Sequence, residues 1–211
     1  MEMLDITPVN WTSPDSIIKV IGVGGGGCNA VNYMYNQNIE GCTFIVCNTD
    51  AQAPNKCEVP IKIQLGEGLG AGTNPTEGRN AALNSQDDIA EKVLDDKTEM
   101  LFITAGMGGG TGTGAAPVIA AVAKKKGILT VGVVTIPFRN QGPEAMSKAL
   151  DGISELEKNV DSLLIIDNEK LFGVYGDLLI QQAFPKADEV LATAVRGITE
   201  IIKKRGYVNV D

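Results

Sequence analysis

The chain has 211 residues, which is enough for one α/β domain with a sizeable core. Its 18 basic and 26 acidic residues give a formal net charge of −8, so binding to nucleic acid or to an anionic lipid surface is disfavoured. The sequence contains no histidine, which excludes Ser-His and Cys-His nucleophiles, and its four cysteines match no zinc-site spacing and are expected to be reduced, mostly buried thiols.

Six apolar segments bounded by turn residues are predicted to be strands: 17–23, 43–47, 60–65, 100–105, 129–136 and 162–166. Several are apolar throughout, which is typical of strands covered on both faces of a mostly parallel sheet. Helical patterns occupy 29–36, 75–94 with a break near Ser85, 115–126 and 143–160. Because strands and helices alternate, we predict an α/β fold with a Rossmann-like, doubly wound, mostly parallel sheet.

A long central helix is expected to follow this sheet. From Ala187 to just before Gly206, apolar residues recur at three- and four-residue steps. We therefore expect three parts: a poorly ordered leader (1–14), a Rossmann-like domain (15–184), and the long helix with the start of a further loop (185–211). No apolar run reaches the ~18 residues of a membrane span, and the first fifteen residues lack a secretion signal. We expect a cytoplasmic chain without direct membrane insertion.

The most informative motif is Gly-Met-Gly-Gly-Gly-Thr-Gly-Thr-Gly at 106–114, which lies between a predicted strand and a predicted helix. Such a segment leaves backbone N–H groups unobstructed beside the positive end of a helix dipole, and this arrangement binds phosphate. A flexible linker is disfavoured, because a linker would be more polar and would not lie between two apolar elements. We expect the bare backbone to contact a ligand.

A second glycine-rich loop follows the first strand. Gly22, Gly24 and Gly27 satisfy G-x-G-x-x-G between a strand and a helix, and Asp50 lies near the end of the second strand. These residues make a nicotinamide-dependent oxidoreductase a serious alternative. A dehydrogenase needs one glycine loop for its pyrophosphate, however, and two loops indicate a longer phosphate chain.

The Walker arrangement G-x-x-x-x-G-K-[ST] does not occur, so no lysine is placed by such a loop to hold phosphate. Backbone amides, two helix N-termini and a cation would have to meet the phosphate charge. A third glycine cluster at 66–74 could close over a terminal phosphate, with 71–73 as the part that senses it. The alternative interpretation of this cluster is a mobile surface loop.

On these residues the chain resembles the FtsZ family, the bacterial cell-division GTPases of the tubulin superfamily. The resemblance covers nearly all of 18–211. The segments that carry it are Gly-Gly-Gly-Thr-Gly-Thr-Gly at 108–114, the first loop at 24–29, Asn-Thr-Asp-Ala-Gln at 48–52, the segment 68–75 and the closing Asn-Val-Asp at 209–211. Several ordered matches at consistent spacing make coincidence negligible.

The resemblance implies that the ligand is GTP or GDP, with Mg²⁺ held mainly through phosphate and water and no dedicated protein ligand for the metal. The residues that it implies for nucleotide binding are Gly25, Gly26, Gly27, Cys28, Asn29, Ala71, Gly72, Gly108, Gly109, Gly110, Thr111, Gly112, Gln141, Phe184 and Asp188. Phe184 would stack on the purine, and Asp188 would accept hydrogen bonds from the guanine N1–H and N2–H. Taken without the resemblance, Asp188 reads as an acidic residue that stabilises a helix N-terminus.

Two positions depart from the family pattern. Gln141 stands where a ribose-binding glutamate is usual, and Ala145 stands where an arginine is usual. A neutral amide makes weaker hydrogen bonds than a carboxylate, and alanine makes none. We therefore expect weakened nucleotide affinity, partly offset by the neighbouring Arg139.

The resemblance also implies GTP hydrolysis between subunits of a filament, with Asn209 and Asp211 as catalytic residues from the loop that follows the long helix. A second acid of that loop and a smaller C-terminal domain would lie beyond residue 211, so these 211 residues are expected to bind nucleotide but to hydrolyse and polymerise poorly. The implied partners are further copies of the protein, membrane tethers and regulators at the mid-cell division site. A non-enzymatic assembly module that holds GDP as a structural ligand is the other alternative.

Overall fold

The computed structural model describes residues 17–39, 41–53, 57–170 and 180–203, and in 180–185 and 200–203 only the backbone. The expected leader at 1–14 lies outside the described residues, as do Asn209 and Asp211.

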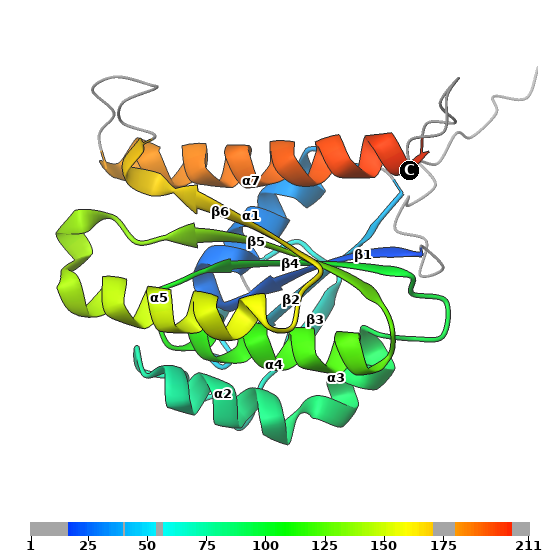
Figure 1. The fold of residues 1–211 in the computed structure, drawn as a ribbon, viewed down its shortest axis with the longest axis horizontal. Helices are drawn as coiled ribbons and strands as arrows, with labels where there is room; N and C mark the ends of the chain where they lie inside the picture. The colour runs from blue at the N-terminus through cyan, green and yellow to red at the C-terminus, as the bar shows by residue number, and fades with distance from the viewer. Residues whose placement is uncertain (1–16, 40, 54–56, 171–179, 204–211) are drawn as a thin grey trace, which may run out of the picture.

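A six-stranded, fully parallel sheet forms the centre of the fold (Figure 1). Its strands are β1 (Ile18–Val23), β2 (Thr43–Asn48), β3 (Ile61–Gln64), β4 (Met100–Gly106), β5 (Leu129–Ile136) and β6 (Ser162–Asp167). They lie in the order β3-β2-β1-β4-β5-β6. This is a doubly wound Rossmann-type order, and it confirms the predicted fold class. The chain reverses its direction of travel across the sheet between β1 and β4.

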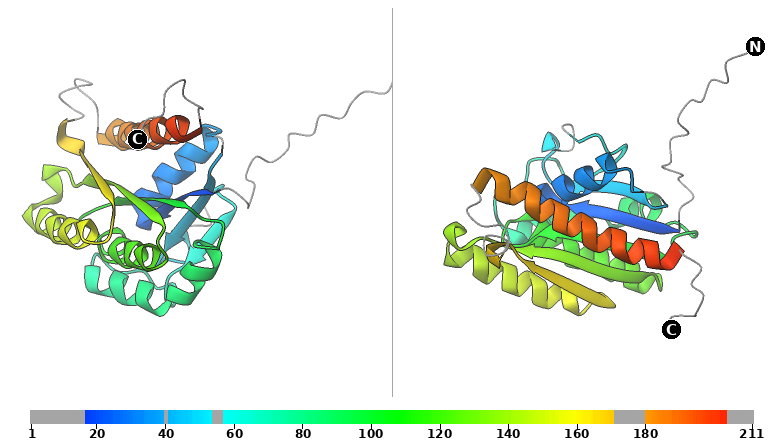
Figure 2. Two further views of the ribbon diagram at one scale, coloured as in Figure 1. Left: turned by 45° about the vertical axis from the view of Figure 1, so that its right-hand side comes forward. Right: turned by 90° about the horizontal axis from the view of Figure 1, so that it is seen from above.

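Helices cover both faces of the sheet, as Figures 1 and 2 show. One face carries α1 (Gly24–Asn36) and α7 (Ile180–Lys203), and the other carries α2 (Pro75–Asn84), α3 (Gln86–Lys92), α4 (Thr111–Lys125) and α5 (Pro143–Glu157). A short 3₁₀ turn, η2 (Arg139–Gln141), precedes α5. The predicted break near Ser85 is confirmed, because α2 ends at Asn84 and α3 begins at Gln86.

Two hydrophobic cores result from the alternation of side chains along the buried strands. In β1, Ile21 and Val23 pack towards α4, whereas Ile18 and Val20 pack towards α1 and α7. All four cysteines are buried and free, as expected.

An ion pair between a buried lysine and a partly exposed aspartate lies at the amino end of the sheet. Lys19 on β1 is only 2% exposed, and its Nζ lies 2.7 Å from Oδ2 of Asp95, whose other oxygen accepts a hydrogen bond from the Thr98 hydroxyl. The pair compensates an ammonium group that burial would otherwise make very costly.

Three helices begin earlier than the sequence predicted. α1 begins at Gly24 rather than near 29, α4 begins at Thr111 rather than near 115, and α7 begins at Ile180 rather than at Ala187. For α1 and α4 the reason is that glycines, which are poor helix formers, occupy the first turn. The expected domain boundary at 184/185 falls inside α7, so the division into domains stays a prediction.

Candidate nucleotide-binding site

The starts of α1 and α4 converge at the carboxyl ends of β1 and β4. A Cβ added to Gly24 would lie 2.9 Å from the backbone N of Gly112 and 3.2 Å from Cβ of Thr111, so the two glycine-rich segments are in contact. Neither helix has a side-chain cap or an acidic residue in its first turn. The first N–H groups of both helices are therefore left for another hydrogen-bond acceptor, and the two helix dipoles favour an anion at this place.

The glycines of the two segments differ in their surroundings. A Cβ on Gly27 would lie 2.3 Å from the carbonyl oxygen of Thr104, and a Cβ on Gly112 would lie 2.5 Å from that of Gly106. By contrast, a Cβ on Gly25 or Gly109 would meet no atom within 4 Å. The first kind of glycine permits close packing of helix on strand, and the second kind leaves backbone open to a ligand.

The third glycine cluster lies against the start of α4. A Cβ on Gly110 would come within 2.8 Å of Cβ of Ala71 and 2.9 Å of the backbone N of Asn74. Gly70 N–H donates to the Thr49 carbonyl at 2.8 Å, and the Asn74 side chain caps α2. The segment 66–74 is thus fastened at both ends rather than free. Predicted residue Ala71 thus lies beside Gly110, whereas a Cβ on Gly72 would meet no atom within 4 Å.

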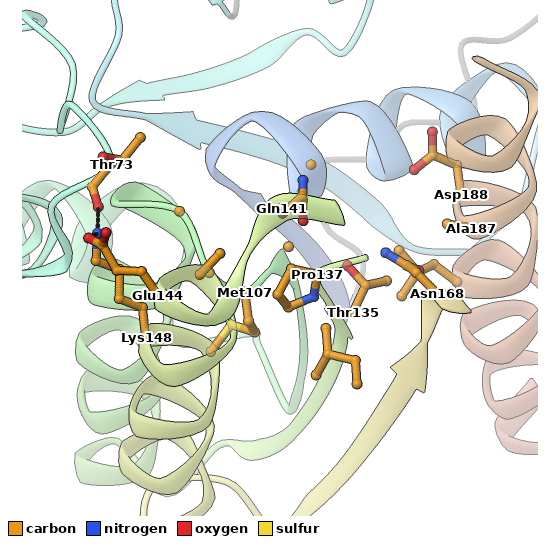
Figure 3. A pocket seen from close by; sticks show the side chains of 17 residues that line it. Thr73, Met107, Thr135, Pro137, Gln141, Glu144, Lys148, Asn168, Ala187 and Asp188 are labelled. Atoms are coloured by element: carbon orange, nitrogen blue, oxygen red, sulfur yellow. Dashed lines mark hydrogen bonds and ion pairs between the residues drawn. The ribbon is translucent and has the colours of Figure 1, made fainter. Parts of the chain in front are cut away.

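A pocket of about 490 Å³ opens beside this convergence (Figure 3). Of the predicted residues, Gly26, Gly108, Gly109, Gln141 and Asp188 line it. Thr73, from the segment expected to sense a terminal phosphate, and Ala145, at the position where the family usually has an arginine, also line it. The remaining lining residues were not assigned to nucleotide binding by sequence reasoning, and these are Gly106, Met107, Thr135, Ile136, Pro137, Glu144, Lys148, Asn168, Ala187 and Leu191. The structure therefore brings residues from β4, β5, α5 and α7 around one cavity.

One side of the pocket carries two polar side chains, of which Asn168 is buried and Asp188 is partly buried. In Figure 3, Asp188 and its neighbour Ala187 on α7 lie on the same side of the pocket as Asn168. Burial raises the pKa of the Asp188 carboxyl to about 7. Asn168 is 6% exposed, and its Oδ1 has no hydrogen-bond partner among the described residues. Unpaired buried polar atoms are rare, so this side of the pocket is suited to a ligand with polar hydrogens.

The opposite side of the pocket carries a charged pair. Nζ of Lys148 lies 2.6 Å from Oε1 of Glu144, one turn earlier on α5, and donates a hydrogen bond to the Thr73 carbonyl at 3.2 Å. Figure 3 shows these three side chains grouped at the end of the pocket away from Asp188. The hydrogen bond from Lys148, followed by its charge, lowers the pKa of the Glu144 carboxyl.

Several predicted residues do not face the pocket with their side chains. Cys28 turns its thiol into the core, where Sγ donates to the carbonyl of Cys47 at 3.4 Å, and burial raises its pKa to about 12. It could contact a ligand only through its backbone. Asn29 is exposed and does not line the pocket, and the side chain of Phe184 lies outside the described residues.

A sequence signal could have found Asn168. It follows directly after β6, and parallel α/β sheets bind ligands beyond the carboxyl ends of their strands. Lys148 offered no such signal, because it is one of many charges on an exposed helix face.

Residues 17–176 match the family model of the GTPase domain of the Tubulin/FtsZ family. The chain belongs to the tubulin/FtsZ family. This assignment confirms the resemblance found in the sequence and gives no support to the nicotinamide-dependent alternative.

Similarity to individual proteins of the tubulin/FtsZ family supports the assignment. The chain is 54% identical to the cell division protein FtsZ of Porphyromonas gingivalis, over 96% of this chain and 46% of that protein. It is 55% identical to the FtsZ of Pseudomonas putida, over 100% of this chain and 52% of that protein. The structure of an empty FtsZ dimer from M. jannaschii matches with a TM-score of 0.86 at 44% identity, covering 92% of this chain and 57% of that one. The chain thus spans about half the length of the curated relatives that it matches.

Two classes of feature are missing from the described ranges of this tubulin/FtsZ family chain. No helix there combines the length and the apolar character that a membrane span needs. In the same ranges, no cluster of three or more Asp, Glu, Cys or His side chains is arranged to hold a metal ion.

Proposed function

We propose that this chain is a guanine-nucleotide-binding GTPase domain of a filament-forming cell-division protein. The observation that carries the proposal is the convergence of two uncapped helix starts, from α1 and α4, at the switch point of a parallel sheet. Family membership and the names of the relatives, which are cell division proteins, support the biological part.

The phosphates would lie over the open backbone of Gly25, Gly26, Gly109 and the first residues of α4. This placement satisfies N–H groups that have no partner within their helices. Mg²⁺ would bind beside the β- and γ-phosphates, mainly through phosphate and water oxygens, as suits a cation that keeps much of its hydration shell. The Thr49 and Thr111 hydroxyls nearby are hard oxygen donors of the type that this cation prefers.

The base would lie at the Asp188 end of the pocket. A carboxylate can accept from the N1–H and the 2-amino group of guanine together, whereas adenine presents an acceptor at N1 and has no 2-amino group. The unpartnered Oδ1 of Asn168 offers a further acceptor nearby. Phe184, one turn earlier in α7, is proposed to stack on the purine. These groups favour GTP over ATP.

Hydrolysis is proposed to occur between subunits, with Asn209 and Asp211 of one copy acting on the nucleotide of the next. Self-association into filaments, contact with membrane tethers and regulators, and a place at the mid-cell division site in the cytoplasm are parts of the same proposal. Slow turnover and weak polymerisation by the 211 residues alone remain a prediction.

Binding can be tested by titrating the purified chain with GDP, ADP and NADH. We expect GDP to bind at least about tenfold more tightly than ADP, because a wrong base leaves buried polar groups unpaired. Asp188→Asn should weaken GDP binding, and Glu189→Gln, which removes the same charge from the next residue of α7, should not. NADH that competes with GDP, or ADP that binds as well as GDP, would refute the proposal. GDP binding without any turnover in the complete protein would favour the assembly-module alternative.

A further inference from the structure

The pocket has a single cationic side chain among its described lining residues, and this is Lys148. The other charged side chains in the lining are Glu144 and Asp188, both acidic. A nucleoside triphosphate carries several negative charges, and helix dipoles compensate only part of such a charge. The pocket therefore has one side chain with which to meet the remaining phosphate charge directly.

Lys148 is at the end of the pocket where a terminal phosphate would lie. It is grouped with Thr73 on the side away from Asp188 (Figure 3). The segment that contains Thr73 packs over Gly110, at the start of α4. If the base lies at Asp188 and the phosphates run along the starts of α1 and α4, the last phosphate points towards this segment.

The ammonium of Lys148 has capacity for a further acceptor. It contacts one carboxylate oxygen of Glu144 at 2.6 Å and the carbonyl oxygen of Thr73 at 3.2 Å, and an ammonium group has three donors. The Lys148 side chain is 27% exposed, whereas that of Glu144 is 82% exposed. Screening by solvent makes the pair with Glu144 weak, so a phosphate can compete for the same ammonium group.

We propose that Lys148 binds the terminal phosphate of the nucleotide, and that Glu144 competes with that phosphate for Lys148. The inference rests on the proposed function, since it assumes a guanine nucleotide in this pocket. Lys148 comes from α5 and not from a glycine loop, which is why no phosphate-loop pattern in the sequence includes it. Because Lys148 also contacts the Thr73 carbonyl, it would connect the terminal phosphate to the segment 66–74.

The inference makes opposite predictions for the two partners of the ion pair. Lys148→Gln should weaken binding of a non-hydrolysable GTP analogue about tenfold and binding of GMP less than about twofold, because the lost contact is with the last phosphate. Lys148→Arg should retain most of the affinity for the analogue. Glu144→Gln should tighten binding of the analogue by about threefold, because it removes both a competitor and a negative charge.

Lys158→Gln is the matched control, because it removes the same charge from an ion pair with Glu155 at the far end of α5, away from the lining. It should change none of the affinities. Each variant is compared with wild type by calorimetry after its melting temperature shows that it is folded. The salt dependence of analogue binding should also be weaker in Lys148→Gln than in wild type.

Equal losses for GMP and the analogue in Lys148→Gln, or no loss for either, would overturn the inference. So would a loss in Glu144→Gln as large as that in Lys148→Gln, which would mean that the pair only fastens α5 to the segment 66–74. Wild-type protein that binds no guanine nucleotide would instead refute the proposed function itself, so the two failures are distinguishable.

Discussion

Oγ1 of Thr49 and Oγ1 of Thr111 lie 2.6 Å apart and share a hydrogen bond. Thr49 is 3% exposed and follows β2 directly, whereas Thr111 is the first residue of α4. The bond therefore connects the end of one strand to the helix start that is proposed to bind phosphate. It fixes the direction in which the Thr111 hydroxyl points.

Replacement of Thr49 by valine should lower both stability and nucleotide affinity. Valine has nearly the same shape but leaves the Thr111 hydroxyl without its partner, so we expect a loss of about 1 kcal/mol in the free energy of unfolding. GDP affinity should fall with it, because the hydroxyl at the start of α4 is no longer held. Urea unfolding and GDP titration measure the two effects.

Thr49→Ser and Thr104→Val provide the controls. Serine keeps the hydroxyl and should preserve GDP affinity. Thr104 is fully buried in β4, and its hydroxyl has no hydrogen-bond partner among the described residues, so the same change to valine there should not destabilise the protein. Equal destabilisation by Thr49→Val and Thr104→Val would show that the bond to Thr111 contributes nothing.

The affinity for GDP should depend on pH through Asp188. Its pKa is about 7 in the unliganded protein because the carboxyl is buried, and guanine needs the carboxylate form. Below about pH 7 a proton must be released on binding, so the affinity should fall by up to about tenfold per pH unit relative to Asp188→Asn. The same phosphates titrate in both proteins, so a constant ratio of the two affinities from about pH 5.5 to about pH 8 would contradict this.

The stability of the unliganded protein should depend on pH in the opposite sense. Folding raises the pKa of the Asp188 carboxyl from its ordinary value of 3.8 to about 7, so the folded state holds this proton more tightly than the unfolded state does. The contribution of this carboxyl to the free energy of unfolding is fully present below about pH 4 and is lost as the pH rises to about 7. We expect Asp188→Asn to gain about 2 kcal/mol relative to wild type over this window, allowing for solvent at a partly exposed group. Parallel stability curves for the two proteins would be inconsistent with a buried, protonated carboxyl.

Alanine at two glycines should separate binding from folding. A Cβ at Gly25 meets no protein atom within 4 Å, so Gly25→Ala should fold as well as wild type but obstruct a phosphate at the start of α1. A Cβ at Gly114 would lie 2.0 Å from the carbonyl oxygen of Pro75, so Gly114→Ala must move α2 away from α4 and should cost about 2 kcal/mol or more. Thermal melts and GDP titrations of both variants test the distinction. Normal GDP binding by Gly25→Ala would remove this residue from the site.

Periodicity predicted most of the fold. Strands such as β4 are nearly continuous apolar runs. The alternation of strands with helices leads to a parallel sheet, because parallel strands need crossover connections, which are usually helices. The starts of α1 and α4 could not be predicted in the same way. Glycine has a low helix propensity, so the sequence carries no helix signal at the two starts, which the fold brings into contact, as between Gly24 and Gly112.

The parts of the candidate site that bind through backbone N–H groups could be predicted from the sequence. The parts that depend on a single side chain were harder to predict. A glycine cluster between a strand and a helix indicates a backbone binding site directly, because few other structural roles require several adjacent glycines there. Asn168 and Lys148 each stand alone in a segment of ordinary composition, and only the fold brings them to one pocket, from the residue after β6 and from α5. The roles of Phe184, Asn209 and Asp211 remain predictions.

The ion pair between Lys19 and Asp95 has a practical consequence for genetic screens. It lies at the amino end of the sheet, whereas the glycine-rich starts of α1 and α4, which together form a cradle for phosphate in the proposed function, lie at the carboxyl end. Substitution of Asp95 by a neutral residue would leave the buried Lys19 ammonium group without its counter-charge. The cost would be a large fraction of the free energy of unfolding, which is small in most proteins. A screen for inactive alleles would then recover changes at this position alongside those of the cradle, and protein abundance, not activity, would tell the two groups apart.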